Sequence, residues 1–109
     1  MTNYVENAEI LKTLAHPMRI TILKELITRG TCNVNQLVDI LGIPQSTVSQ
    51  HLSKMKSQKL IMNVRRGLEV YYSAPNKQVN AIVELLLVES TIRWNLDSFE
   101  DVVVVYGVK

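Results

Sequence analysis

The residues best suited to chemistry lie between Gln45 and Arg66, where the chain has no acidic residue but has five of its 12 basic ones. The same stretch is rich in serine and glutamine. Small hydroxyl and amide side chains can hydrogen-bond to base edges, and lysine and arginine neutralise phosphates. We therefore predict an interface with double-stranded DNA, the alternative being a polar, solvated helix. The predicted DNA-binding residues are Gln45, Ser46, Thr47, Ser49, Gln50, Ser53, Lys54, Lys56, Arg65 and Arg66.

Two short helices joined by a tight corner are expected to position these side chains. In the second helix the apolar residues Val48, Leu52 and Met55 are spaced i, i+4 and i+7, so they form one stripe that packs on a core. The corner before this helix reads LGIP over residues 41–44. Its glycine can end a helix in the left-handed conformation, and its proline suits the first position of the next helix. This pattern is typical of a helix-turn-helix.

Helices upstream of the corner are expected to build the core. Apolar residues at helical spacing predict a first helix over residues 5–15 and a second over residues 17–29, opened by a proline. Asn33 and Gln36 form a variant of the capping box and predict the start of a third helix. His16, at the junction of the first two helices, is expected to pack there or to cap the second.

After the helix-turn-helix the apolar pattern changes from helical to alternating. Residues 61–65 and 69–73 read as strands, and the Arg-Gly-Leu connection between them contains the glycine that a tight reversal needs. A β-hairpin in this position is a wing. Arginines at its tip could reach phosphates or an adjacent minor groove, or they could only solubilise an exposed turn.

The last predicted helix, over residues 76–92, is apolar on two sides. Such a helix is buried on both sides, and a chain of 109 residues has only one core to offer it. We therefore expect the second side to meet another copy of the chain. The predicted dimerisation residues of the first and last helices are Ile10, Leu11, Leu14, Leu85, Val88 and Ile92.

The composition fits one small domain over residues 1–92, with a tail of uncertain structure over residues 93–109. The chain is 47% hydrophobic with a net charge of +2, and it has one cysteine and no apolar run of about 18 residues. We expect a cytoplasmic protein without internal disulfides or membrane contact. No nucleophile elbow or phosphate-binding glycine loop is present, so we predict that it is not an enzyme and needs no cofactor.

Three segments resemble the ArsR/SmtB family of bacterial winged helix-turn-helix regulators: LKTLAHPMRITILKEL, QLVDILGIPQSTVSQHLSKMKSQKLI and GLEVYYS. The resemblance implies a mostly helical fold with about five helices and a two-stranded wing. It also implies a homodimer held by its first and last helices, bound to an inverted-repeat operator as a repressor. Residues 46, 47, 49 and 50 would then face the major groove and Arg65 and Arg66 would be wing contacts, while His51 would fix the recognition helix by a hydrogen bond.

The chain departs from the metal-sensing members of that family. Where they carry two cysteines near the third helix, this sequence reads Asn33-Val34-Asn35, and no histidine follows His51. We therefore expect metal-independent regulation. The neighbouring Cys32 is a redox candidate, although a thiol packed as a small apolar group is the alternative. A winged-helix module that binds protein and not DNA is the remaining alternative.

Overall fold

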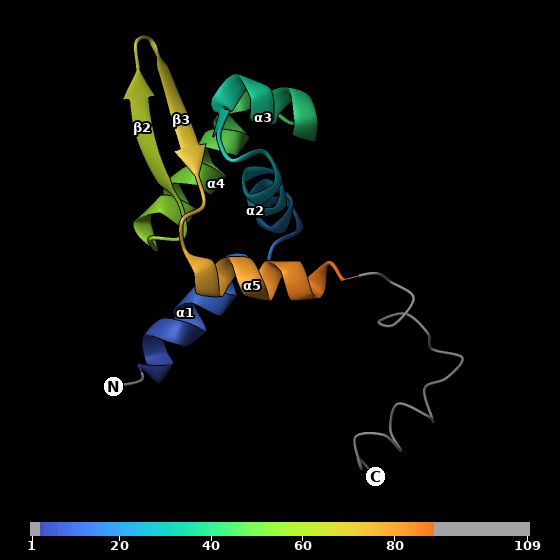
Figure 1. Ribbon diagram of the computed structural model, residues 1–109, viewed down its shortest axis with the longest axis vertical. Coiled ribbons are helices and arrows are strands. Elements are labelled where there is room, and N and C mark those ends of the chain that lie inside the picture. The colour runs from blue at the N-terminus through green and yellow to red at the C-terminus, as the bar shows by residue number, and fades with distance from the viewer. Residues whose placement is uncertain (1–2, 89–109) are drawn as a thin grey trace, which may run out of the picture.

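The computed structural model describes residues 3–88, which form five helices and three short strands. The helices are α1 (Tyr4–Leu14), α2 (Pro17–Arg29), α3 (Val34–Leu41), α4 (Gln45–Ser57) and α5 (Lys77–Leu86). The strands are β1 (Cys32–Asn33), β2 (Met62–Arg66) and β3 (Glu69–Ser73). The predicted fold of five helices and a wing is thus confirmed (Figure 1).

The sheet has one strand more than the sequence predicts. β2 and β3 form the antiparallel wing, in which Val64 lies opposite Tyr71. β1 pairs with the other edge of β3, so that Cys32 lies opposite Tyr72 and the strand order is β1-β3-β2. Two residues between helices are too few to show an alternating pattern, which is why the sequence does not indicate β1. This strand attaches the base of the wing to the link between α2 and α3.

Local capping explains where α2 and α3 begin. The Nδ1 atom of His16 accepts a hydrogen bond of 3.1 Å from the backbone N–H of Met18, so His16 caps α2. At the start of α3, the side chains of Asn33 and Gln36 each accept a hydrogen bond of 2.8 Å from the other's backbone N–H. Both predicted caps are confirmed.

The corner of the helix-turn-helix has the expected glycine. Gly42 adopts a left-handed conformation with φ of 67°, and its N–H donates to the carbonyl of Val38 at 2.8 Å, which ends α3. Pro44 is the cap residue before α4, not its first helical residue as predicted. Its fixed φ of −60° still directs the chain into the helix.

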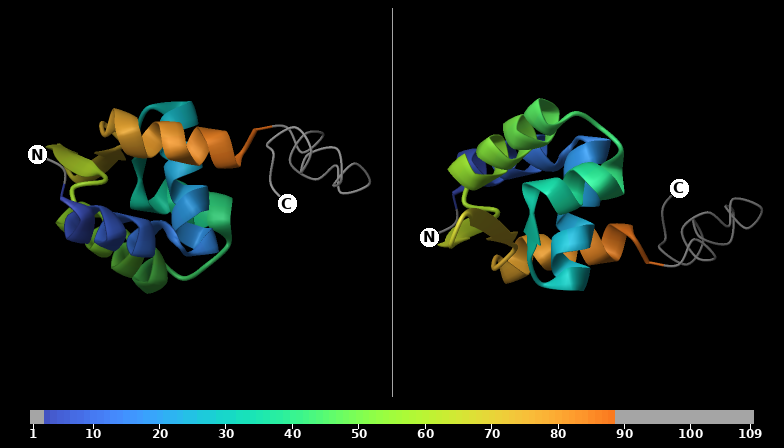
Figure 2. Two further views of the ribbon diagram at one scale, coloured as in Figure 1. Left: turned by 90° about the horizontal axis from the view of Figure 1, so that it is seen from below. Right: turned by 90° about the horizontal axis from the view of Figure 1, so that it is seen from above.

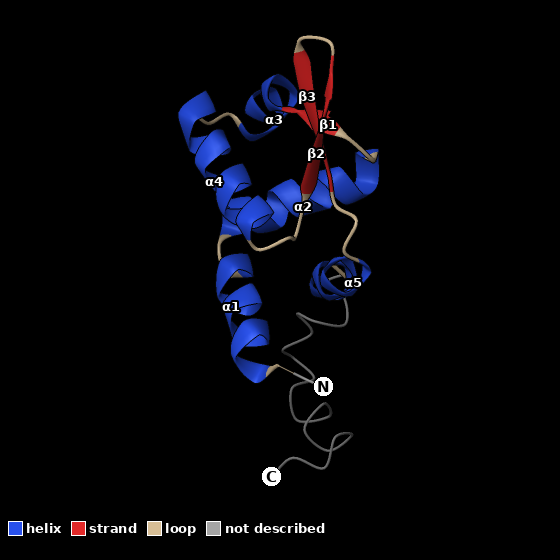
Figure 3. Cartoon of the chain, turned by 90° about the vertical axis from the view of Figure 1, so that its left-hand side faces the viewer, coloured by secondary structure: helices blue, strands red, loops and turns tan. Residues whose placement is uncertain are grey.

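The core is built around α2, which lies between α4 and α5 (Figure 3). Seen from above in Figure 2, α4 and α5 occupy opposite edges, and α2 and α3 lie between them. This arrangement lets side chains from every helix and from the wing's base meet at one apolar centre. The buried core residues are Leu14, Ile22, Leu23, Leu26, Cys32, Leu37, Val48, Leu52, Met55, Leu60, Ile61, Val79 and Val83.

The last helix is shorter and less buried than predicted. α5 ends at Leu86, whereas the sequence suggests a helix to residue 92. In this helix only Val79 and Val83 are buried, whereas Ile82 and Leu86, on the same apolar side, are 36% and 45% exposed. Ile92 and the predicted tail over residues 93–109 lie outside the described residues. Within residues 3–88, no helix is long and apolar enough to cross a membrane.

Candidate nucleic-acid interface

Helix α4 separates an apolar face from a polar one, as the spacing predicts. Val48, Leu52 and Met55 are at most 1% exposed and pack into the core. The predicted DNA-binding residues of this helix lie on the surface, with Thr47 half-buried and the others exposed. α3 packs against α4 and braces it. The structure therefore offers one accessible surface made of the side chains of Gln45, Ser46, Ser49, Gln50, Ser53, Lys54 and Lys56.

The wing presents two exposed arginines near its tip. A Nη1–H of Arg65 donates to the carbonyl of Gly67 at 3.4 Å, and the Arg66 guanidinium lies 5.7 Å from the centre of the Tyr71 ring. Gly67, with φ of 64°, makes the reversal between β2 and β3. The following residue, Leu68, is 97% exposed. The arginine side chains are thus oriented by local contacts and remain open to a ligand.

The basic residues of α4 and the wing have no acidic partner among residues 3–88. The ion pairs in that range join Lys12 to Glu9, and Lys24 and Arg29 to Glu25. All of these lie on α1 and α2. Because their charges are not neutralised within the described chain, the α4 and wing cations are available to phosphates.

The wing lies at the opposite end of the molecule from the predicted dimer helices, and α4 runs between them, with its last residue, Ser57, close to α1 and the start of α5. In Figure 3 the wing and α4 occupy the upper part, and α1 and α5 the lower part. Figure 1 shows the same separation. Association through α1 and α5 would therefore leave the wing and the first turns of α4 uncovered.

A buried polar contact holds α4 against α2. His51, on α4, is 8% exposed, and its Nδ1 atom accepts a hydrogen bond of 3.2 Å from Nε–H of Arg19. A Nη1–H of Arg19 also donates to the carbonyl of Thr13, at 3.2 Å. The hydrogen bond that the family resemblance implies for His51 is therefore present. The sequence did not identify Arg19 as its donor, because the two residues are 32 positions apart.

The apolar surface of α1 and α5 only partly matches the predicted dimer residues. Leu11, Leu85 and Val88 are 54%, 70% and 42% exposed, and Ile10 is half-buried. Leu14 is only 4% exposed within the subunit, so it has almost no surface left for the predicted contact with a second copy. The helical spacing could not distinguish it from Leu11, because α2 covers only one side of α1.

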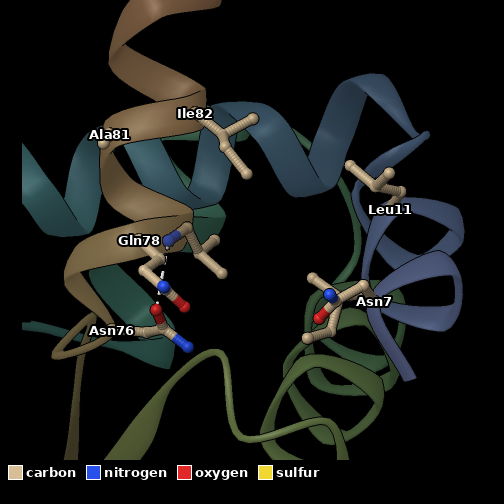
Figure 4. A pocket seen from close by; sticks show the side chains of 8 residues that line it. Asn7, Leu11, Asn76, Gln78, Ala81 and Ile82 are labelled. Carbon is tan, nitrogen blue, oxygen red and sulfur yellow. Dashed lines mark hydrogen bonds between the residues drawn. The ribbon is translucent and has the colours of Figure 1, made fainter. Parts of the chain in front are cut away.

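A groove of about 460 Å³ lies between α1 and α5. Figure 4 shows Asn7 and Leu11 on one wall, facing Asn76, Gln78 and Ile82 on the other. The remaining lining residues, Ile10, Val79 and Ala81, are apolar. The groove therefore joins the exposed apolar surfaces of the two helices into one region.

Cys32, the predicted redox candidate, is a buried residue. Its side chain is 0% exposed and belongs to the apolar core. Burial raises the pKa of the thiol, which disfavours the thiolate that reacts with oxidants. The structure thus supports the alternative of a thiol packed as a small apolar group. Residues 3–88 contain no group of three metal-ligating side chains close enough to hold a metal ion.

Comparison with known proteins agrees with this geometry. The family described as bacterial regulatory protein, arsR family, matches residues 16–62. The chain is 53% identical over 81 residues to the transcriptional repressor PagR of Bacillus anthracis, covering 74% of this chain and 81% of that one. It is 37% identical over 79 residues to the transcriptional regulator YgaV of Escherichia coli K12, covering 72% and 80%.

Solved structures give the same result. The crystal structure of PagR matches with a TM-score of 0.69 at 51% identity, covering 74% of this chain and 92% of that chain. HlyU from Vibrio cholerae matches with a TM-score of 0.72 at 29% identity, covering 78% and 91%.

An exposed polar helix in a helix-turn-helix, followed by a basic wing, defines a winged helix-turn-helix regulator. The named relatives are regulators of transcription. The chain belongs to the arsR family of bacterial regulatory proteins, and it is a transcriptional regulator and not an enzyme.

Proposed function

We propose that this protein is a homodimeric transcriptional repressor that binds an inverted-repeat operator without a metal ion. The observation that carries the proposal is the exposed polar face of α4, which has no acidic residue and is followed in the chain by a wing with two exposed arginines. Hydroxyl and amide groups on such a helix can read base edges in the major groove. The lysines and arginines would bind the phosphate backbone and set the register.

The proposed dimer uses the apolar surface of α1 and α5. Leu11, Leu85 and Val88 are exposed there, and the groove between the two helices continues the same surface. Burying these side chains against a second copy would remove apolar area from water. A two-fold dimer would place its two α4 helices in major grooves about one helical turn of DNA apart, which is roughly 34–36 Å.

Metal independence is supported by the start of α3. Metal-sensing relatives carry cysteine ligands in this region, as the family resemblance implies, whereas here Asn33 and Gln36 complete the capping box with hydrogen bonds of 2.8 Å. Both side chains are therefore already used to begin a helix. We expect a chelator and added divalent zinc to leave operator affinity unchanged.

The test is a fluorescence-anisotropy titration with the protein's own promoter region and a scrambled duplex of the same length. Gln50→Ala should lose about 1–3 kcal/mol of binding free energy with the operator and none with the scrambled duplex, because a lost base contact affects only the matched base pair. Lys54→Ala should weaken binding to both duplexes. It should also reduce the number of counterions released on binding, measured from the salt dependence of the affinity, by about one. Lys77→Ala, which removes an exposed lysine at the start of α5, is the control that should change neither.

Two outcomes would contradict the proposal. Equal binding of the promoter and the scrambled duplex would remove sequence-specific recognition. Salt-insensitive binding, or no binding to either duplex, would favour the alternative of a module that binds protein.

A further inference from the structure

The contact between α2 and α4 contains three side chains that can carry positive charge. His16 and Arg19 come from α2 and its cap, and His51 comes from the middle of α4. The two imidazole rings meet edge to face with centroids 4.6 Å apart, and the Arg19 Nε–H donates to His51 Nδ1 at 3.2 Å. The cluster therefore joins the recognition helix to the rest of the domain through polar atoms.

The hydrogen-bond pattern determines the protonation state of His51. Its Nδ1 atom accepts from Arg19, so this nitrogen carries no proton and the ring is neutral. His16 is in the same situation, because its Nδ1 atom accepts from the backbone N–H of Met18. Arg19 cannot reverse its role, since a guanidinium only donates. The contact exists only while His51 is uncharged.

Protonation of His51 would replace this attraction by repulsion. A hydrogen on Nδ1 would point at the Arg19 N–H, and two positive groups would lie at hydrogen-bond distance. The groups that face His51 are His16 and Arg19 from α2, and α1 contributes the Thr13 carbonyl bound to Arg19. Among residues 3–88 the acids in ion pairs are Glu9 and Glu25, which pair with other residues. Burial, followed by the charges of His16 and Arg19, lowers the pKa of His51.

We propose that the His51–Arg19 hydrogen bond is a proton-sensitive clamp that holds α4 in position to bind DNA. At neutral pH the clamp is closed. When His51 takes up a proton in more acidic solution, the hydrogen bond breaks and α4 loses its tie to α2. Operator affinity then falls. Arg19 and His51 act as positioning residues, and the proposal rests on the proposed DNA-binding function.

The composition of the chain makes this proposal easy to test. The sequence contains 2 histidines, and both belong to this cluster. Histidine is the side chain whose ordinary pKa places its charge change between pH 5 and 8. The expected direction is also diagnostic, because added positive charge near DNA would by itself strengthen binding to phosphates at low pH. The clamp predicts weaker binding.

The experiment is an anisotropy titration of the operator duplex between pH 8 and pH 5.5 at constant ionic strength. At pH values below the pKa of His51, the wild-type affinity for the operator should decrease. The decrease should be up to about tenfold per pH unit for each subunit that must keep its clamp closed. His51→Gln can still accept a hydrogen bond from Arg19 but cannot be protonated there, so its affinity should not depend on pH. His16→Asn keeps a capping side chain and leaves the hydrogen bond between Arg19 and His51 in place, so the fall in affinity on acidification should remain.

A second measurement follows the clamp without DNA. In wild-type protein, the pH dependence of the His51 ring signals in NMR gives the midpoint of its protonation. The α4 amide signals should change with the same midpoint. Operator affinity that is constant or rises on acidification would overturn the proposal, as would an equal fall in His51→Gln. If no duplex binds at any pH, the proposed function fails, and the clamp is then judged by whether the α4 signals follow His51.

Discussion

Replacing Lys59 by glycine is expected to stabilise the protein. Lys59 is the residue other than glycine with a positive φ, 61°, among residues 3–88. It lies just beyond α4, where its N–H donates to the carbonyl of Lys56 at 2.9 Å and the N–H of Leu60 donates to that of Met55 at 3.0 Å. This pair of bonds closes the helix as a Schellman motif. Leu60 is fully buried, so its packing holds the preceding residue in this conformation.

The size of the effect follows from two opposing contributions. A left-handed conformation costs an L-residue about 1–2 kcal/mol, which glycine avoids. Glycine also gives the unfolded chain more freedom, which costs about 0.4–1 kcal/mol. The midpoints of these two ranges differ by about 0.8 kcal/mol, which is the expected net gain in the free energy of unfolding.

Urea denaturation followed by circular dichroism, at one protein concentration, measures this gain. Lys59→Ala is the matched control, because it removes the same charge but keeps a Cβ in the left-handed conformation. We expect the alanine variant to be no more stable than wild type and the glycine variant to exceed both. Equal stability of the two variants would refute the explanation by backbone strain.

Four further predictions concern association, oxidation and acid stability. Leu85→Glu should shift the protein towards monomer in analytical ultracentrifugation, whereas Leu68→Glu, the same change at an exposed wing residue, should not. If both variants remain dimeric, the dimer interface does not include this part of α5. Mild peroxide should leave operator affinity unchanged because Cys32 is buried and its pKa is raised, and a loss that Cys32→Ser prevents would reinstate the redox sensor. The pKa of His51 is lowered in the folded protein, so the unfolded chain binds the proton more tightly. The free energy of unfolding should therefore decrease as the pH falls from about 7 towards the folded-state pKa, and His51→Gln should abolish this decrease. The pKa of Glu25, lowered by hydrogen bonds to Arg29 and Lys24, should produce a separate loss of stability in more acidic solution, below about pH 4.5, that persists in His51→Gln.

The features that the sequence predicts correctly depend on neighbouring residues. The capping box of Asn33 and Gln36, the left-handed Gly42 and the apolar stripe of α4 each follow from spacings of four residues or fewer. In each case local backbone geometry and side-chain type suffice to define the structure. This is why residue spacing alone predicts the polar face of α4.

The features that the sequence misses depend on the packing of distant segments. Leu11 and Leu14 are equivalent by spacing, but only Leu14 is covered. Ile82 and Leu86 continue the apolar side of α5, yet the subunit's core reaches only to Val83 and leaves both partly exposed. Helical periodicity indicates that a side is apolar, but it does not indicate how far the neighbouring element extends over it.

Arg19 shows how such a distant contact can determine the position of the functional helix. A guanidinium is planar and its donors have fixed directions. One of its donors binds the Thr13 carbonyl in the last turn of α1, and another binds His51 in the middle of α4. The ends of these two hydrogen bonds cannot move independently without breaking one of them. Consequently the position of the recognition helix depends on α1 as well as on α3, although α1 lies at the opposite end of the molecule from the wing (Figure 3).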